Sequence, residues 1–222
     1  MDLSLMSVVG TLVSVGVAIL SLVLHELAHA WAALMLGDPT AKEQGRLTLN
    51  PAAHLDPFGS VLLPVLMALA QGPVFGYARP VPFDPRRLRH PARDEALVAL
   101  AGPACNLLQA VVAGLAFQAL AGFWDGGYGL AYWLLRVTSS WCYVNCSLAF
   151  FNLIPLPPLD GSKLLSPFLR GEGRRIYQQV QAYSMPILLV VLYVLPGLLG
   201  FDPLSSYLRA TAIRLAGHLL GA

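Results

Sequence analysis

Two histidines and a glutamate stand within one short stretch of the chain, His25-Glu26-Leu27-Ala28-His29. An α-helix places residues i and i+4 on one face, so both imidazoles can reach the same metal ion. Glu26 would lie beside them, about 100° around the helix from His25. Zinc binds neutral imidazole nitrogens and lowers the pKa of a bound water from about 16 to about 7, and a neighbouring carboxylate then accepts the proton. The spacing therefore predicts a zinc site with Glu26 as general base.

The surroundings of this motif argue against a chance match. Between Leu3 and Gly37, Glu26 is the only Asp, Glu, Lys or Arg. Each ionisable group in a lipid-embedded helix costs roughly 2.5–3.5 kcal/mol on insertion scales. Three ionisable residues at membrane depth need a compensating partner, and a divalent cation is the most economical one.

A third ligand is expected from the segment Asn152-Leu-Ile-Pro-Leu-Pro-Pro-Leu-Asp160-Gly161. Its prolines break the helix before them and free backbone groups, which a water-accessible cavity lined by protein could satisfy but lipid could not. Asp160 is the candidate ligand, because it is the other acid that adjoins a long apolar run. The alternative is that Pro-Pro-Leu-Asp-Gly forms an ordinary cytoplasmic turn.

The composition indicates that the chain is a membrane protein. Of 222 residues, 56% are hydrophobic and 12% are charged, about half the charged fraction of an ordinary soluble chain. The 14 Lys and Arg are nearly balanced by 12 acids, and the aromatic residues sit in apolar runs, which excludes nucleic acid as the main partner. The 3 cysteines lie in apolar stretches and are read as small core residues rather than a disulfide framework.

Long apolar blocks predict the helices that must position the site. Each block exceeds the roughly 20 residues that cross about 30 Å of hydrocarbon. The first block lacks a basic n-region and is too long for a signal peptide, so it should stay in the membrane. We expect spans at about 7–36, 95–121, 130–154 and 180–200.

Two further segments complete the expected fold. Gly and Pro residues within 57–78 shorten any helix there, which favours a re-entrant segment or short span at 58–74. Residues 204–220 are read as an interfacial helix or a further crossing. The predicted fold class is an all-α polytopic membrane protein, a bundle of about five to six membrane-embedded helices, as a single domain over residues 1–222.

Basic residues predict the orientation. Lys and Arg crowd three connections, 42–46, 79–93 and 163–175, whereas 122–130 has none. Because positive loops tend to remain cytoplasmic, we expect a multi-pass protein of the cell membrane with its N-terminus outside. His25 lies about two thirds of the way along the first span, so the active site should open towards the cytoplasm.

The motifs, their order and their membrane setting resemble the site-2 protease family of intramembrane zinc metalloproteases, in its small bacterial form. Two further segments, Gly45-Arg-Leu-Thr-Leu-Asn-Pro51 and Ala101-Gly-Pro-Ala-Cys-Asn106, are similar to segments of that family. No inserted peptide-binding domain such as a PDZ is recognised in the sequence. Access of the substrate would then be governed by membrane elements.

The resemblance implies a complete set of roles. One Zn²⁺ per chain would be held by His25, His29 and Asp160, and Glu26 would be the general base. The reaction would be hydrolysis of a peptide bond in or near a transmembrane segment of a membrane-protein substrate, as in regulated intramembrane proteolysis. The residues themselves predict a membrane metal site with a base, and the peptide substrate comes from the resemblance.

Three other residues are candidates for binding the substrate or stabilising the oxyanion. By resemblance, Asn152 would hold the substrate backbone near zinc, although its amide could instead cap a helix end. Gly45 opens a short extended piece that resembles the family's membrane-associated β element, which pairs with substrate as an added strand. His54 is either an auxiliary hydrogen-bond donor to the site or a histidine of a loop or interface.

Two other functions remain as alternatives. A divalent-metal transporter would also place His and Asp within the membrane, but it has no need for Glu26 beside the ligands, and the chain has no His-rich loop for gathering metal. A membrane scaffold that binds transmembrane helices without cutting them could dispense with the base. Zinc hydrolysis explains more of the motifs than either alternative.

Overall fold

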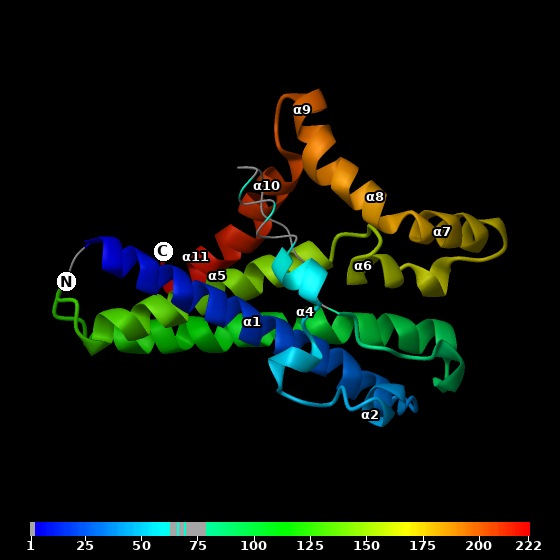
Figure 1. Ribbon diagram of the computed structural model, residues 1–222, viewed down its shortest axis with the longest axis horizontal. Helices are drawn as coiled ribbons and strands as arrows, with labels where there is room; N and C mark the ends of the chain where they lie inside the picture. The colour runs from blue at the N-terminus through cyan, green and yellow to red at the C-terminus, as the bar shows by residue number, and fades with distance from the viewer. Residues whose placement is uncertain (1–2, 63–65, 67–68, 70–78) are drawn as a thin grey trace.

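Three long helices form the body of the molecule in a computed structural model that describes residues 3–62, 66, 69 and 79–222. They are α1 (Leu3–Met35), α4 (Pro91–Ala121) and α5 (Leu130–Asn152), and each packs on the other two. In Figure 1 they run side by side along the longest axis, and both chain ends lie at the same end of this bundle. The expectation of a mostly helical chain is confirmed.

Shorter elements connect and extend the bundle. Between α1 and α4 lie α2 (Thr40–Glu43), η1 (Pro51–Ala53), η2 (Pro57–Leu62) and η3 (Pro85–Arg87). After α5 come α6 (Asp160–Lys163), η4 (Ser166–Phe168), α7 (Glu172–Ala182), α8 (Ser184–Leu189), η5 (Val190–Val194), α9 (Leu195–Leu199), α10 (Pro203–Leu208), η6 (Arg209–Ile213) and α11 (Arg214–Leu220). Helices α7 to α9 project from the bundle, and α10 to α11 return to it (Figure 1).

The C-terminal helices dock on the bundle through small side chains. A buried cluster joins α4, α5 and the last helices, and its members are Ala110, Ala113, Cys142, Cys146, Ala212 and Ala216. Small residues let helix backbones approach closely, which is the usual way that helices pack in membranes. Cys142 and Cys146 are unpaired and buried, as expected of core residues. Residues 203–220 therefore pack against α4 and α5.

The expected number of membrane-embedded helices, about five to six, is not confirmed in the described part of the chain. Among the described residues, 2 helices are long and apolar enough to cross a membrane, Met6–Met35 and Pro91–Ala121, or up to 3 if the bent pair Glu172–Ala182 and Ser184–Leu199 is one span. The expected span at 130–154 does form a helix, α5. It carries polar residues such as Asn145, which is buried in the bundle rather than exposed to lipid. The higher number is not confirmed.

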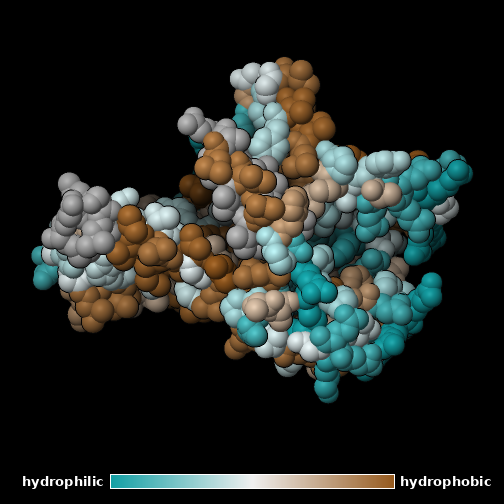
Figure 2. Space-filling view, viewed as in Figure 1, coloured by the Kyte–Doolittle hydropathy of each residue, from teal (hydrophilic) through white to brown (hydrophobic). Residues whose placement is uncertain are grey.

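Polar and apolar surfaces separate along the bundle. Figure 2 shows hydrophilic side chains gathered at the end that carries α2 and α7, and hydrophobic ones over the opposite part and the α8–α9 arm. On α4, Leu108, Val112 and Leu115 expose one apolar face. Such an exposed apolar face is what a lipid environment requires.

The chain after Gly45 does not form the expected β element. No strand forms in the described part of the chain. Gly45 takes a turn at φ 66°, and the Thr48 carbonyl accepts from the His54 Nε2 at 2.8 Å instead of from another strand. Most of the re-entrant segment expected at 58–74 lies outside the described residues, and η2 covers only its beginning.

Candidate metal centre

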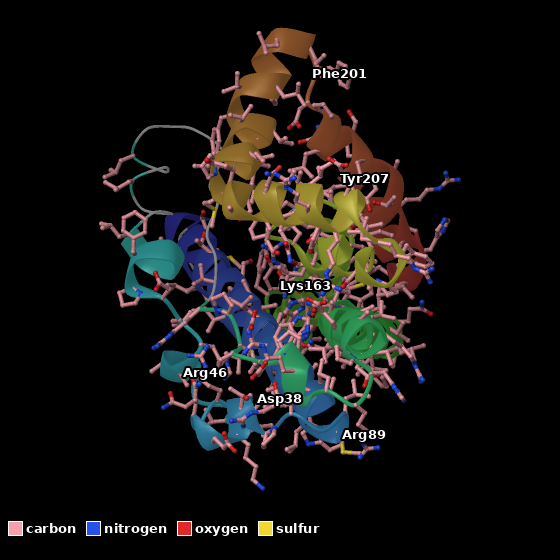
Figure 3. The ribbon with its side chains drawn as sticks, turned by 90° about the vertical axis from the view of Figure 1, so that its right-hand side faces the viewer. Asp38, Arg46, Arg89, Lys163, Phe201 and Tyr207 are labelled. Atoms are coloured by element: carbon pink, nitrogen blue, oxygen red, sulfur yellow. The ribbon has the colours of Figure 1, made fainter. Side chains whose placement is uncertain are left out.

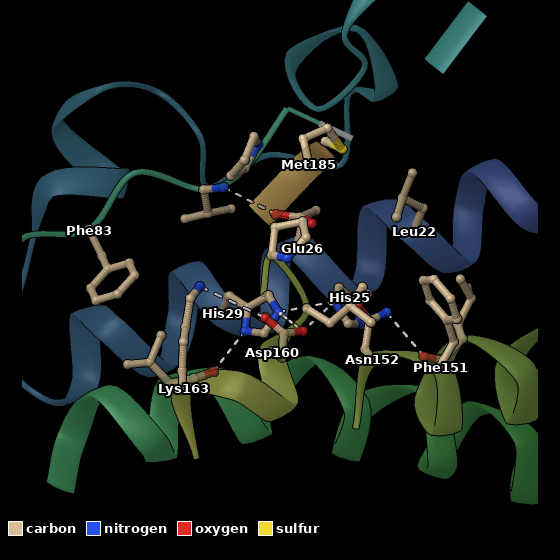
Figure 4. A pocket seen from close by; sticks show the side chains of 16 residues that line it. Leu22, His25, Glu26, His29, Phe83, Phe151, Asn152, Asp160, Lys163 and Met185 are labelled. Carbon is tan, nitrogen blue, oxygen red and sulfur yellow. Dashed lines mark hydrogen bonds and ion pairs between the residues drawn. The ribbon is translucent and has the colours of Figure 1, made fainter. Parts of the chain in front are cut away.

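Three buried ligand atoms meet between α1 and α6. The Nε2 atoms of His25 and His29 are 3.0 Å apart. The Asp160 Oδ2 lies 3.2 Å from the first and 3.1 Å from the second. Each of the three residues is less than a tenth exposed. The structure thus brings His25, His29 and Asp160 together, as Figure 4 shows.

The donor set fits a zinc ion. The Nδ1 of His29 lies 2.7 Å from the Val98 carbonyl oxygen, which can only accept, so Nδ1 carries the proton and Nε2 presents its lone pair. Ligands about 2.0 Å from a tetrahedral zinc lie about 3.3 Å from one another, close to the observed separations. Lone pairs at such distances need a positive charge between them, which a metal ion or a proton can supply.

Asp160 is anionic in this setting. Burial raises the pKa of its carboxyl, but positive charge beside it, here a proton on the imidazoles of His25 and His29, outweighs burial and lowers the pKa below its usual range; a metal ion at the same point acts in the same direction. The charged carboxylate is the form that a metal ligand requires.

The α5–α6 connection positions Asp160 beside His25 and His29. Helix α5 stops before three prolines, because proline lacks the N–H and clashes with the preceding turn. The chain then folds back so closely that a Cβ at Gly161 would overlap the carbonyls of Leu153 and Ile154. Ser162 Oγ donates to the Leu159 carbonyl at 2.7 Å and fixes the start of α6.

A pocket of about 210 Å³ opens beside the three ligands. Glu26 lines it, half-buried, and its Oε2 accepts a hydrogen bond from the Val81 N–H at 3.2 Å. The remaining walls are mainly apolar side chains, among them Leu22, Phe83, Val98, Leu148, Phe151 and Met185 (Figure 4). A carboxylate beside the ligands and within the pocket can exchange a proton with a molecule bound there.

The chain from Arg79 to Asp84 runs across the pocket and is tied down at both ends. Arg46 Nη2 donates to the carbonyls of Arg79 at 2.6 Å and Pro80 at 3.1 Å. Asp38, just after α1, accepts from the Asp84 N–H at 2.6 Å. Figure 3 shows Asp38 and Arg46 in the lower part of the view. These contacts, which the sequence did not reveal, fix residues 79–84 at one edge of the pocket. We call this stretch the rim segment.

Of the three candidates for substrate binding, the structure places one in the pocket. Asn152 lines the pocket, and its Nδ2 donates to the Leu148 carbonyl at 3.0 Å. Gly45 and His54 are not among the lining residues. The buried His54 contributes its carbonyl, which accepts from the Arg79 N–H at 2.9 Å. His54 therefore supports the site indirectly, through its hydrogen bond to the rim segment.

Lys163 is a pocket residue that sequence reasoning missed. Its Nζ lies 3.9 Å from the Asp160 Oδ1 and 5.3 Å from the centre of the Phe83 ring. The spacing of three residues from Asp160 on one helical turn was the available signal. Lys163 therefore contacts both the Asp160 carboxylate on α6 and the Phe83 ring in segment 79–84.

Comparison with known proteins gives a consistent set of relatives. YwhC of Bacillus subtilis (strain 168), named as a zinc metalloprotease, is 40% identical over 186 residues, which are 80% of this chain and 78% of that protein. Rip2 of Mycolicibacterium smegmatis, also named as a zinc metalloprotease, is 31% identical over 201 residues, 86% of this chain and 74% of that protein. Protease RseP of Photorhabdus luminescens is 35% identical over 80 residues, 36% of this chain and 34% of that protein.

A family profile and a search of solved structures complete the comparison. The profile described as Peptidase family M50 matches residues 130–195, which include Asn152 and Asp160. No solved structure matches the chain significantly.

Proposed function

Because the chain belongs to peptidase family M50, the site-2 type of zinc metalloproteases, we propose that it hydrolyses a peptide bond in or near a transmembrane segment of a membrane-protein substrate. The observation that carries the proposal is the meeting of two imidazole nitrogens and a carboxylate oxygen beside Glu26. The motif stands on an apolar helix long enough to span a membrane. This setting favours a substrate that is itself in the membrane.

His25, His29 and Asp160 hold the single Zn²⁺ in this proposal, and their buried, closely spaced donor atoms support it. When bound, zinc supplies Lewis-acid activation of water and of the substrate carbonyl. Glu26 accepts the proton of the attacking water and then donates it to the leaving amine nitrogen. Its contact with the Val81 N–H keeps the carboxylate turned into the pocket.

Asn152 and the rim segment hold the substrate. The Asn152 amide lies in the pocket at the end of α5, where it can bond a backbone group of an unwound substrate. Its bond to the Leu148 carbonyl uses one N–H of the amide, so the second N–H and the amide oxygen can bond the substrate. Gly45 and His54 contribute to substrate binding indirectly. They belong to the connection after α2, in which the His54 carbonyl accepts a hydrogen bond from the Arg79 N–H.

The proposal extends to orientation in the membrane. We place a single multi-pass domain, residues 1–222, in the cell membrane with its N-terminus outside and the site opening to the cytoplasm. Support comes from the hydrophilic end that carries α2 and α7 (Figure 2), because two of the three basic connections expected to be cytoplasmic, 42–46 and 163–175, overlap these elements.

Cleavage of synthetic single-span substrates by the purified protein in liposomes tests this function. We expect cleavage by the wild type and none by Glu26→Gln, whereas Glu43→Gln, which changes an exposed acid paired with Arg87, should cleave normally. Uptake of Zn²⁺ into the liposomes without cleavage would favour the transporter. Capture of substrates that neither wild type nor Glu26→Gln cuts would favour the scaffold.

A further inference from the structure

A line of buried polar side chains leads away from His25 into the bundle. Ser21 and His25 come from α1, Asn106 from α4 and Asn145 from α5, and the serine and both asparagines are fully buried. His25 Nδ1 lies 2.6 Å from Asn106 Oδ1. Asn106 Nδ2 donates to Asn145 Oδ1 at 2.9 Å, and Asn145 Nδ2 donates to Ser21 Oγ at 2.8 Å.

The direction of these hydrogen bonds is set by a backbone carbonyl. Asn145 Nδ2 also lies 3.0 Å from the carbonyl oxygen of Trp141, and a carbonyl can only accept. The nitrogen of the Asn145 amide must therefore face that carbonyl, and its oxygen must face Asn106. Asn106 then has to turn its nitrogen to Asn145 and its oxygen to His25.

The orientation of the Asn106 amide determines the tautomer of His25. Because Asn106 presents an oxygen, His25 must carry its proton on Nδ1 and leave the Nε2 lone pair free. That Nε2 is the atom 3.2 Å from the Asp160 Oδ2. His29 receives the matching contact from the Val98 carbonyl on the same helix, α4. One helix thus sets the tautomer of both histidines.

We propose that Asn106 is a positioning residue for the metal ligand His25, with Asn145 and Ser21 fixing the direction of its amide. The inference rests on the proposed function in one respect, that His25 binds the metal. Outer hydrogen-bond partners of metal-binding histidines fix ring orientation and tautomer, and their loss typically weakens metal binding about 10–100-fold. Asn106 joins helices as well, but helix packing needs no defined direction of its amide.

The test compares zinc affinity among four purified proteins, the wild type, Asn106→Leu, Asn106→Asp and Gln109→Leu. The last is a matched control, because Gln109 stands one turn further along α4 and accepts a bond from the Trp141 Nε1 at 3.1 Å without touching His25. Zn²⁺ affinity is measured by competition with a chromophoric chelator. The absorption spectrum of the Co²⁺-loaded protein reports the ligand field independently of activity.

We expect Asn106→Leu to bind Zn²⁺ about 10–100-fold more weakly and to shift the Co²⁺ spectrum. Asn106→Asp should stay closer to the wild type, because its carboxylate still accepts the His25 Nδ1 proton. Gln109→Leu should bind like the wild type. Equal affinity for wild type, Asn106→Leu and Gln109→Leu would overturn the proposal, as would equal losses in the two Asn106 variants.

Asn145→Leu provides a second test of the proposal in case Asn106→Leu does not fold. It leaves Asn106 in place but removes the groups that orient it, so we expect weaker Zn²⁺ binding than in Gln109→Leu. Affinity equal to that of Gln109→Leu would contradict the directional role. A wild type that binds no Zn²⁺ would instead defeat the proposed function, so the two failures are distinguishable.

Discussion

Gly102 of α4 lies directly against the imidazole of His29 on α1. A Cβ at this position would overlap Nε2 of His29 and Cε1 of His25. A residue without a side chain is therefore what lets α4 pass beside the two histidines. The same helix can then supply the contacts of Val98 and Asn106 to their Nδ1 atoms.

Gly102→Ala should weaken zinc binding. Overpacking of a tight contact costs about 1–3 kcal/mol, which corresponds to roughly 5–150-fold in affinity. Gly16→Ala on α1 is the control, because a Cβ there meets nothing within 4 Å. Chelator competition measures both, and unchanged affinity in Gly102→Ala would show that the imidazoles do not need this close approach.

Removal of the metal should lower both activity and stability. A ligand that binds only the folded state adds about 2.7 kcal/mol at a free concentration of 100 times its Kd. We expect the Tm of the detergent-solubilised wild type to fall after chelation and to recover with Zn²⁺. In His29→Ala, which lacks a ligand, the Tm should not respond. An equal response in both proteins would place the zinc elsewhere.

Asn152→Ala should separate catalysis from metal binding. Because the Asn152 amide lines the pocket but is not among the three converging donors, we expect about a 10–100-fold loss of cleavage, the size of one or two hydrogen bonds to a reacting substrate. Zinc content should stay at the wild-type level. If cleavage were normal and only the Tm fell, Asn152 would be a helix cap, since its Nδ2 bonds the Leu148 carbonyl.

Asp38 should make stability depend on pH. Burial raises the pKa of its carboxyl, but hydrogen bonds from Thr40 and from the Asp84 N–H outweigh burial and lower the pKa below its usual value. Because the folded pKa is lowered, the ionised carboxylate stabilises the folded protein above its unfolded pKa of about 3.9. This contribution is lost as the pH falls through the folded value.

We therefore expect Asp38→Ala to have a lower Tm than the wild type at pH 7, and the difference to shrink below about pH 4. Thermal unfolding in detergent at the two pH values measures it. Glu43→Ala removes an exposed ion pair with Arg87 and should change the Tm little at either pH. A Tm difference for Asp38→Ala that persists undiminished in acid would contradict the role of the charge.

The geometry of the candidate site was predictable where residues close in sequence are also close in space. His25, Glu26 and His29 share one helical turn, so their proximity follows from helix geometry. Asp160 was found by its chemistry, as an acid beside a proline-broken apolar run, and the structure places it against both histidines. Long apolar runs likewise predicted α1, α4 and α5 within a few residues of their ends.

Other features depend on how the helices pack, which no local pattern encodes. The role of Asn106 could not be predicted, because a single amide in an apolar run does not indicate which neighbour it contacts. The contacts of Arg46 and Asp38 with the rim segment join residues more than thirty positions apart. A strand was expected after Gly45, but a strand needs a partner, and the described residues supply none there.

The most direct test of the account is the zinc content per chain of the wild type, Glu26→Gln and Asp160→Ala, purified side by side in detergent. We predict one zinc in the wild type and in Glu26→Gln, because Glu26 transfers protons in the reaction and is not a metal ligand. Asp160→Ala should retain little, because it loses the carboxylate that lies within 3.2 Å of both histidines. A full equivalent of zinc in Asp160→Ala would contradict the assignment of the three ligands.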